Sequence, residues 1–470
     1  MVNGSRLAMH PQPNLIDALD TLSPETLIAW DKTYVWHPFT PMKQYLASEP
    51  VIIRRGQGVK LEDIHGNWYY DGTSSIWLNV HGHNVPELNA ALEAQLRRIA
   101  HATMLGQANV PAVALAKRLI EVAPPGLQRV FYSDSGATAV EIALKMAIQF
   151  WANQGWRSKR YILGFTNNYH GDTLGAVGVA PDPLFHWPFL DLLPGHPRAP
   201  YPYPHDRLAE SLEAVEHVLR TRHHELAALI VEPVEGAGGI LPAPAGFLRA
   251  LRTLCDRYQV LLIIDEVATG FGRTGRLFAC EAEGISPDLL CLGKGLTGGY
   301  LPLAATLTTE RVFEAFLGEV EERKTFFHGH SYTGNPLGCA VALASLELLL
   351  QRLPSLPAKV ERLRAHLAPL SEHPFVAELR QAGFMVGIEI VADRARRTPF
   401  PYGAQVGFIV ARHARRRGML VRPIGSVLIF MPPLAATEAE LEEMTTILKA
   451  AFEDALPELE RLAQNLQPNV

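Results

Sequence analysis

The chain has 470 residues, a formal net charge of −5 at pH 7 and a hydrophobic content of 48%, enough for one large domain and a smaller one. The mildly acidic balance excludes the basic footprint of a nucleic-acid-binding protein, and the four cysteines show neither a CxxC pair nor metal-ligand spacing, so we expect buried thiols and no metal. We see no signal peptide and no uninterrupted apolar run of membrane-spanning length, so a cytoplasmic protein is expected.

The first 80 residues combine a helix start with short strands. Ser23 is followed by a proline, which predicts an N-cap and a first helical turn. Residues 51–53 and 60–72 are predicted to form short antiparallel strands with a His-Gly-Asn turn. The loop at 73–83 places many hydrogen-bonding groups beside Trp77, and it could contact a substrate or be an ordinary polar turn.

Helices alternate with strands over residues 86–350, a pattern that predicts a parallel sheet. The strand 129–133 leads through small residues into a long helix. Because the first amides of a helix lack intrahelical partners, this turn could hold a phosphate, although many such turns bind nothing. The strand 161–165 leads to Tyr169, which could stack on a planar ring or be purely structural.

Further along, residues 181–205 are rich in proline and aromatic residues and are expected to form a long irregular loop over a site. Glu232 ends another predicted buried strand. A polar turn that contains Ser331 precedes the helix 337–350 and is a second candidate for a phosphate contact. Residues 351–470 alternate helices with short strands, which predicts an α+β domain that the N-terminal strands join.

Two ionisable residues stand at the ends of apolar runs that are predicted to be neighbouring buried strands. Asp265 closes one run and Lys294 closes the other. Ligands of such sheets collect beyond the carboxyl ends of the strands. A desolvated amine can form a Schiff base, and a buried carboxylate needs a cationic partner. Pyridoxal phosphate (PLP) would supply an aldehyde and a protonated ring nitrogen; the alternative is a structural ion pair and a solvated lysine.

The same region carries a resemblance to a known family. Residues 262–275, 287–288 and 293–295 together resemble the signature of the class III aminotransferases, which are PLP-dependent enzymes of fold type I. This resemblance implies an α/β fold with a mostly parallel central sheet flanked by helices, and a smaller α+β domain built from the two chain ends. The implied divisions are an N-terminal segment at 1–80, a PLP-binding domain at 81–350 and a C-terminal domain at 351–470.

The resemblance also implies roles for individual residues. Lys294 is similar to the Schiff-base lysine that moves a proton, Asp265 to the partner of the pyridinium nitrogen, and Tyr169 to the residue that stacks on the ring. Ser331 matches a residue that family members donate from the neighbouring subunit, which implies a homodimer with shared active sites. The other implied cofactor-binding residues are Ser135, Gly136, Ala137 and Glu232.

Three segments narrow the resemblance: Trp36-His-Pro, residues 79–83 and Arg422-Pro are similar to the branch of the family that aminates 8-amino-7-oxononanoate to 7,8-diaminononanoate in biotin biosynthesis. Members of this branch take the amino group from S-adenosylmethionine or lysine. Arg422 matches the residue that pairs with the substrate carboxylate, a task suited to a guanidinium. The alternative is another class III ω-aminotransferase that acts on a diamine or an ω-amino acid. The implied substrate-binding residues are Phe39, Trp77, Tyr169, Asp172, Gly329 and Arg422.

The donor side departs from the pattern of this branch. Members that use S-adenosylmethionine commonly have tryptophan where Ile76 stands and tyrosine where Phe39 and Ile429 stand. A sulfonium cation and an adenine ring both favour aromatic walls. These replacements therefore predict that lysine is used at least as well as S-adenosylmethionine; the alternative is that they are neutral packing changes and the usual donor is retained.

Overall fold

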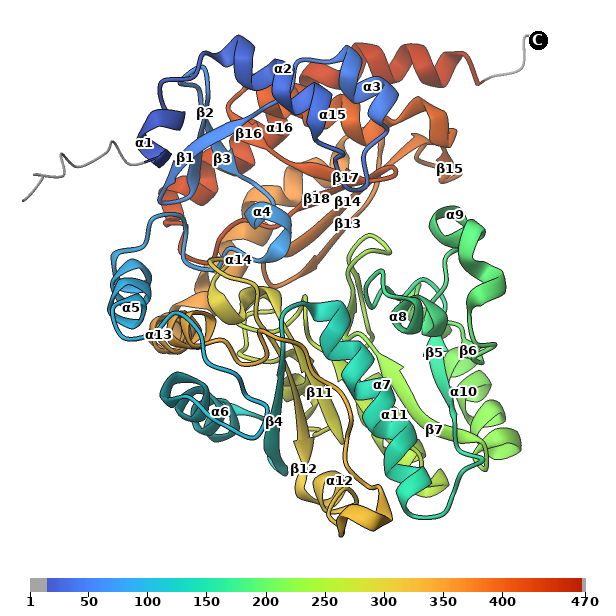
Figure 1. The fold of residues 1–470 in the computed structure, drawn as a ribbon. Coiled ribbons are helices and arrows are strands. Elements are labelled where there is room, and N and C mark those ends of the chain that lie inside the picture. The colour runs from blue at the N-terminus through green and yellow to red at the C-terminus, as the bar shows by residue number, and fades with distance from the viewer. Residues whose placement is uncertain (1–14, 467–470) are drawn as a thin grey trace, which may run out of the picture.

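The computed structural model describes residues 15–466, and a seven-stranded sheet forms its centre (Figure 1). The strand order is β4-β12-β11-β10-β7-β5-β6. Only β12 among these strands runs antiparallel to its neighbours, so the sheet is mostly parallel. The strands are β4 (Leu127–Ser133), β5 (Tyr161–Phe165), β6 (Arg198–Ala199), β7 (Leu226–Val231), β10 (Leu261–Asp265), β11 (Leu289–Leu292) and β12 (Ala304–Thr309).

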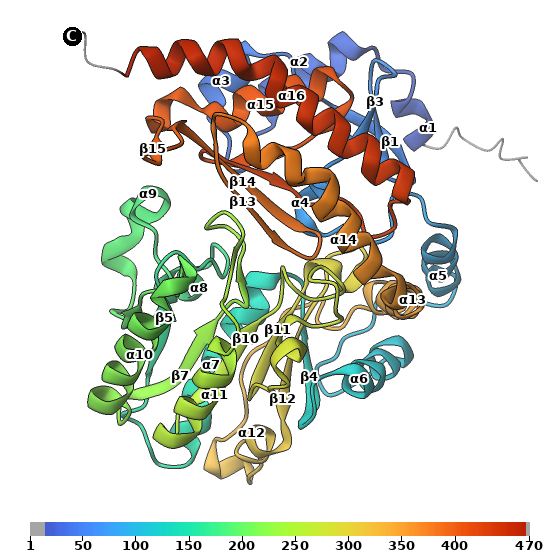
Figure 2. The ribbon, with the colours of Figure 1, turned by 180° about the vertical axis from the view of Figure 1, so that it is seen from behind.

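Helices cover both faces of this sheet, which is why its central strands are apolar throughout (Figures 1 and 2). In β10, Leu261 and Ile263 pack in the cluster that contains helix α7, whereas Leu262 and Ile264 pack with helix α11. The helices of this part are α5 (Pro86–Leu96), α6 (Val110–Val122), α7 (Gly136–Asn153), α8 (Leu174–Val179), α9 (Pro183–His186), α10 (Leu208–Arg222), α11 (Phe247–Tyr258), α12 (Glu310–Glu314) and α13 (Pro336–Arg352).

The two ends of the chain meet in a second layer above the carboxyl edge of the central sheet (Figure 1). Strand β3 pairs in parallel with β16, so that Tyr70 and Asp71 lie beside Met419 and Leu420. The strands here are β1 (Ile53–Gln57), β2 (Lys60–Asp63), β3 (Trp68–Asp71), β13 (Val376–Ala382), β14 (Met385–Asp393), β15 (Thr398–Pro399), β16 (Met419–Leu420), β17 (Arg422–Ile424) and β18 (Val427–Phe430). The helices are α1 (Leu15–Leu19), α2 (Pro24–Tyr34), α3 (Met42–Ala47), α4 (Ser74–Trp77), α14 (Leu356–Leu367), α15 (Val406–Arg416) and α16 (Glu438–Gln464). A small hairpin, β8 (Val234–Glu235) with β9 (Leu241–Pro242), projects from the central part.

This architecture confirms the predicted fold class, whereas the domain boundaries at residues 80 and 350 stay a prediction. The side chain of Ser23 caps α2 as expected, and all four cysteines are buried and free. The expectation of an irregular loop at 181–205 was wrong: Asp182 caps α9, a 3-10 helix spans Trp187–Leu192, and β6 pairs with β5. The helical stretch Pro336–Glu372 is long and apolar enough to cross a membrane by length and composition alone, but its α13 packs against α5 and α6.

A buried arginine links three distant parts of the chain. Arg273 follows β10, is only 1% exposed, and donates hydrogen bonds to the carbonyl oxygens of Pro432 (2.9 Å) and Asn79 (2.7 Å). Burial lowers the pKa of its guanidinium to about 10. Charged hydrogen bonds of this kind are strong, and their loss leaves buried carbonyl groups without a partner. Arg273 therefore fixes both chain ends to the central sheet.

We expect Arg273→Ala to lower the free energy of unfolding by about 3 kcal/mol or more, because two charge-assisted hydrogen bonds are lost in the interior. Urea unfolding followed by tryptophan fluorescence measures the change. The matched control is Arg97→Ala, which removes an exposed ion pair with Glu93 and should cost at most about 0.5 kcal/mol. Equal losses in the two variants would contradict the role given to Arg273.

Candidate active site

Five parallel strands end at the same edge of the central sheet, and each is followed by a predicted site residue. The edge is the one that faces the second layer (Figure 1). Parallel strands present their carboxyl ends together, so residues far apart in sequence lie near one another. The residues that follow β4, β5, β7, β10 and β11 here are Ser135 and Gly136, Tyr169, Glu232, Asp265 at the strand end itself, and Lys294.

Asp265 is held in place by a histidine that sequence reasoning missed. The Nδ1 atom of His170 lies 2.8 Å from Oδ2 of Asp265, and the amide of Val267 donates to Oδ1 at 3.0 Å. The Asp265 side chain is 5% exposed and the His170 side chain is fully buried. Nε2 of His170 has no hydrogen-bond partner. The pair presents a fixed, buried carboxylate to the carboxyl edge of the sheet.

Lys294 follows β11 with its backbone in the left-handed region at φ 40°, a conformation that lysine rarely adopts. Burial lowers the pKa of its ammonium, and the negative charges of Asp265 and Glu232 oppose that shift. Its Nζ atom lies 5.1 Å from the centre of the Trp77 ring. The geometry thus supplies an amine with an increased tendency to be neutral, beside a carboxylate and an aromatic face.

Two buried glutamates lie just beyond the end of β7. Glu232 accepts hydrogen bonds from the amides of Tyr169 (2.8 Å) and Gly236 (3.3 Å). Glu235, which the sequence analysis did not select, accepts one from the Asn168 amide at 3.2 Å, and its other oxygen has no partner. Burial raises the pKa of each glutamate to about 8. Burial thus disfavours the charged form of both side chains.

The start of α7 forms the opposite end of the site. Ser135 is its N-cap, and its side chain accepts a hydrogen bond from the Thr138 amide. The amides that precede Thr138 in the first turn have no intrahelical partner. Neighbouring loops approach these amides closely: a Cβ atom on Gly136 would lie 2.5 Å from Val267, and one on Gly171 would lie 2.3 Å from Cβ of Ala137. Such a helix start is suited to a phosphate. Gly329 and Ser331 lie exposed on the loop that precedes α13.

The substrate side is formed by the second layer. Arg422 on β17 is half-buried, and its Nη2 atom donates to the carbonyl oxygen of Phe39 at 3.0 Å. None of the described carboxylates forms an ion pair with it, and burial lowers the pKa of its guanidinium. The Tyr169 hydroxyl donates to Asp172 at 2.9 Å. An arginine without an acidic partner beside this edge is a ready site for an anionic ligand.

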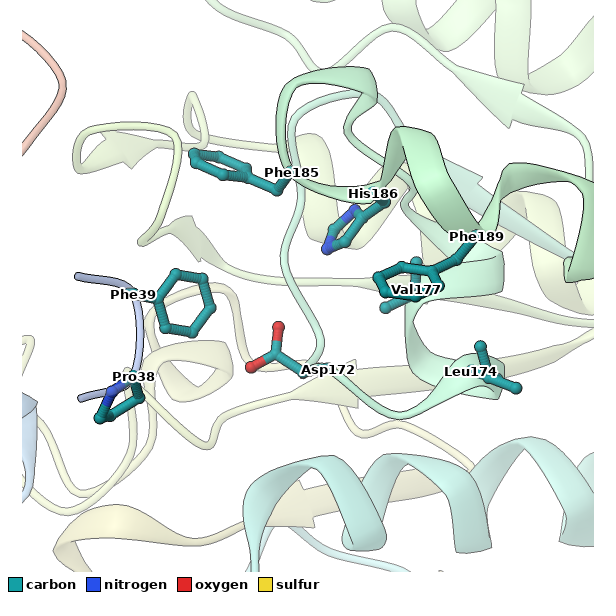
Figure 3. Close-up of a pocket in the computed structure, with 8 residues that line it drawn as sticks. All are labelled: Pro38, Phe39, Asp172, Leu174, Val177, Phe185, His186 and Phe189. Atoms are coloured by element: carbon teal, nitrogen blue, oxygen red, sulfur yellow. The ribbon is translucent and has the colours of Figure 1, made fainter. Parts of the chain in front are cut away.

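The three residues that the sequence related to the choice of amino donor, Phe39, Ile76 and Ile429, lie in different surroundings. Ile429 is 1% exposed and packs with Met385 in a core cluster that Trp77 borders, so its side chain does not line an open space. Ile76 is 45% exposed, and Phe39 is 60% exposed and lines a cavity. The aromatic side chains opposite Phe39 belong to α9 and the following 3-10 helix (Figure 3). The aromatic run at residues 185–189 could have indicated them.

Comparison with known proteins decides the family. The model for class-III aminotransferases matches residues 43–452. The chain belongs to the class III aminotransferases. Relatives include the adenosylmethionine-8-amino-7-oxononanoate aminotransferases of Aquifex aeolicus, 49% identical over 92% of this chain and 98% of the relative, and of Geobacter sulfurreducens, 50% identical over 89% and 95%. The crystal structure of the enzyme of that name from Methanocaldococcus jannaschii superimposes with a TM-score of 0.89, at 43% identity, over 92% of this chain and 99% of that chain.

Class III aminotransferases use PLP, and an amine transaminase from an uncultivated Pseudomonas species, 36% identical with a TM-score of 0.85 over 90% of this chain and 99% of that one, was solved in its PLP-bound form. The residues present here are compatible with that cofactor. The buried carboxylate of Asp265 suits a protonated ring nitrogen, Lys294 provides a lysine whose pKa burial has lowered, and the α7 amides can bind phosphate. The crowded Gly136 and Gly171 allow the loops to close around that helix start.

The raised pKa of Glu235 gives a testable pH dependence. Its pKa is about 8 in the folded chain, above the ordinary value of 4.5. The folded state therefore keeps a proton that the unfolded state releases, and stability falls as the pH rises from about 4.5 to 8. Glu235→Gln removes this titration, so wild-type stability relative to the variant should fall by up to about 1.4 kcal/mol per pH unit in that window.

Urea unfolding at pH 5, 6.5 and 8 measures this difference. The control is Glu87→Gln, at an exposed position on α5, whose stability should follow the wild-type pH dependence. A Glu235→Gln variant that loses stability with pH as steeply as the wild type would show that Glu235 is already ionised in the folded chain.

Proposed function

We propose that this chain transfers an amino group to 8-amino-7-oxononanoate and forms 7,8-diaminononanoate, with PLP as cofactor and S-adenosylmethionine or lysine as donor. The observation that carries the proposal is the unpaired, half-buried guanidinium of Arg422 beside the reactive edge, because the keto substrate ends in a carboxylate. The names of the relatives that are 42–50% identical over about nine-tenths of the chain support the same reaction.

In this proposal the cofactor is held by residues of all the converging strands. Lys294 would hold its aldehyde, Asp265 would pair with its ring nitrogen, and Tyr169 would stack on its ring. Ser135, Gly136 and Ala137 at the start of α7 would bind the phosphate, and Glu232 closes the site from β7. When bound, PLP would supply an electron sink, which allows an amino group to pass from a donor molecule to an acceptor molecule.

The protein's own groups would then move protons and orient the substrate. Because burial lowers the pKa of Lys294, its amine would accept and return a proton more readily than an exposed lysine. His170 keeps Asp265 in one orientation through the 2.8 Å contact. Glu232 accepts the Tyr169 amide at 2.8 Å and so fixes the backbone at this residue. Trp77 and Asp172 border the space for the substrate.

We further propose that the enzyme is a cytoplasmic homodimer. Large apolar side chains lie exposed on the segments 99–113 and 327–332. These segments are in contact, since the ring centres of His101 and Tyr332 lie 5.0 Å apart. Exposed apolar patches of this kind mark protein interfaces. Gly329 and Ser331 lie on the same loop, where a partner could take up their contacts. The exposed apolar side chains are Ile99, Leu105, Val110, Val113, Phe327 and Tyr332.

The proposed reaction is tested by incubating the PLP-loaded enzyme with 8-amino-7-oxononanoate and each of the two donors, and measuring 7,8-diaminononanoate by mass spectrometry. In a second assay, the PLP-loaded enzyme is incubated with diamines or ω-amino acids as amino donors and a general keto acid as acceptor. Formation of 7,8-diaminononanoate supports the proposal. Turnover of the diamines or ω-amino acids with none of 8-amino-7-oxononanoate would favour the ω-aminotransferase alternative.

Lys294 is expected to be the lysine that carries the cofactor, because it is the lysine at the carboxyl edge with a pKa lowered by burial beside Asp265. Borohydride treatment followed by peptide mapping should place the reduced cofactor on Lys294. Lys294→Ala should fold, bind PLP loosely and fail to transaminate. The matched control is the exposed Lys145; an adduct on that residue would refute the assignment.

Arg422→Ala should weaken 8-amino-7-oxononanoate strongly and leave PLP binding intact. Losing a buried charge pair costs about 2–5 kcal/mol, so KM for this substrate should rise roughly thirtyfold or more. Steady-state kinetics measure KM, and the absorbance of bound PLP reports the cofactor. Arg412→Ala, which removes an exposed pair with Glu458, is the control. An unchanged KM in Arg422→Ala would exclude the proposed carboxylate contact.

A further inference from the structure

The short element α4 is a turn of left-handed backbone that begins three residues after Asp71 (Figure 1). All four residues of 74–77 have φ between 48° and 73°, and the two central ones have ψ of 50° and 55°. The amide of Trp77 donates to the carbonyl oxygen of Thr73 at 2.8 Å, which closes the turn. The segment is therefore one hydrogen-bonded turn of left-handed helix.

This turn is unfavourable for the residues that form it. Left-handed backbone brings Cβ close to the following carbonyl oxygen, a contact that only glycine avoids. None of the four residues is glycine, and Ile76 is β-branched, a type for which the conformation is rare. Ile76 is also 45% exposed, so its side chain gains little burial in return. Such strain persists where the surrounding structure imposes it, and it clusters at functional sites.

Asp71 imposes the turn through a buried carboxylate at the end of β3. Its Oδ1 atom accepts the amide of Ser75 at 2.8 Å, and its Oδ2 atom accepts the hydroxyl of the same residue at 2.7 Å. Asp71 is only 2% exposed, and Nε2 of His83 lies 3.0 Å from Oδ2. The hydroxyl of Ser74 donates to the carbonyl oxygen of Met431 at 2.7 Å, which ties the turn to the second layer.

The turn places the indole of Trp77 over the amine of Lys294. The Nζ atom lies 5.1 Å from the ring centre. The ring also packs against the cluster that contains Met385 and Met431, and a Cβ atom on Gly236 would lie 2.9 Å from Cζ3 of the indole. Packing holds the ring at its edges, and the left-handed backbone sets the direction in which it leaves the chain.

We propose that Asp71 is a positioning residue: through the left-handed turn it holds the face of Trp77 over Lys294, so that this amine keeps a proton more readily whenever it is free. The inference rests on the amination reaction proposed above, in which Lys294 moves protons. It adds a residue that acts on this lysine only through the turn.

The face of an indole attracts a cation, and the attraction is larger where water is excluded. Burial lowers the pKa of Lys294, the carboxyl groups of Asp265 and Glu232 raise it, and the guanidinium of Arg273 lowers it. The ring of Trp77 adds an attraction that brings no further charge to a buried edge. The amine can therefore hold a proton that it must also release, as a group that moves protons requires.

The test measures the free amine of Lys294 in the full chain loaded with pyridoxamine 5′-phosphate, which has no aldehyde to occupy the lysine. Competitive labelling with acetic anhydride and peptide mapping give the labelling rate against pH. Only the neutral amine reacts, so the midpoint reports proton affinity, whereas a change of access alters only the plateau. The exposed Lys145 in the same sample is the internal control.

In Trp77→Leu the midpoint for Lys294 should move to lower pH, and labelling at pH 7 should rise on the order of fivefold, as the loss of a cation–π contact predicts. Asp71→Asn should move the midpoint in the same direction, because an amide offers one acceptor oxygen where the carboxylate offers two. Ser75→Ala, which removes only the hydroxyl contact, should give a smaller shift and serves if Asp71→Asn does not fold.

A rescue variant separates the turn from the charge of Asp71. Adding Ile76→Gly to Asp71→Asn should return the midpoint toward its wild-type value, because glycine adopts left-handed backbone without strain. If Asp71 acted on Lys294 by its own charge, the glycine would restore nothing. Asp454→Asn, which removes an exposed ion pair with Arg417 in the second layer, is the matched control and should leave the midpoint unchanged.

Kinetics provide a second measurement. With 8-amino-7-oxononanoate as acceptor, Asp71→Asn should lower kcat more than it raises KM, because the change lies at the lysine. An unchanged midpoint in Trp77→Leu, a shift to higher pH, or a glycine variant without rescue would overturn the inference. Labelling needs no acceptor, so a chain that does not turn over 8-amino-7-oxononanoate would overturn the proposed function and leave the labelling result readable.

Discussion

The register of the parallel ladder between β7, β10 and β11 is the constraint on which the site depends. Ile264 pairs with Val231 and Asp265 pairs with Cys291, so Glu232 stands level with Asp265 and Lys294 follows three residues beyond Cys291. Backbone hydrogen bonds set these offsets, and a slip of one residue would turn every side chain of the strand to the other face. The buried packing of both sheet faces keeps that slip from occurring, since each face has its own helix cluster.

The electrostatics of the site follow from this crowding of charges at a dry edge. One lysine, one aspartate and two glutamates lie there, and burial disfavours the charged form of the lysine and of both glutamates. The lysine pKa falls and the two glutamate pKa values rise, so most of these groups respond by neutralising. Asp265 is held in one orientation, because His170 and the Val267 amide both contact its carboxylate. One fixed carboxylate is thereby placed beside the lysine and the glutamates.

Much of this arrangement could be predicted from the sequence, because apolar runs that end in a polar residue have few interpretations. Asp265 and Lys294 were found in that way, and the family resemblance added roles for Tyr169 and Arg422 that await experiment. The contact of His170 with Asp265 spans 95 residues, and no local pattern encodes it. The same holds for Phe185 and Phe39, which face one another only after folding. The sequence indicated that Ile429 faces the donor, but its side chain lies in a buried cluster. Strand β18 pairs with a strand on each side, and the local sequence does not indicate which way this side chain points.

The pairing of β3 with β16 has a consequence for biosynthesis. Tyr70 donates its amide to Gly418, and Gly72 donates to Leu420 and accepts from Met431. Strands β1, β2 and β3 pair with one another, but one edge of β3 lacks its partner until nearly the whole chain has left the ribosome. At about 5–20 residues per second this delay lasts on the order of tens of seconds. During that time the unpaired edge of β3 is an aggregation hazard. Strand β3 therefore gains its last partner long after the strands of the central sheet have begun to pair.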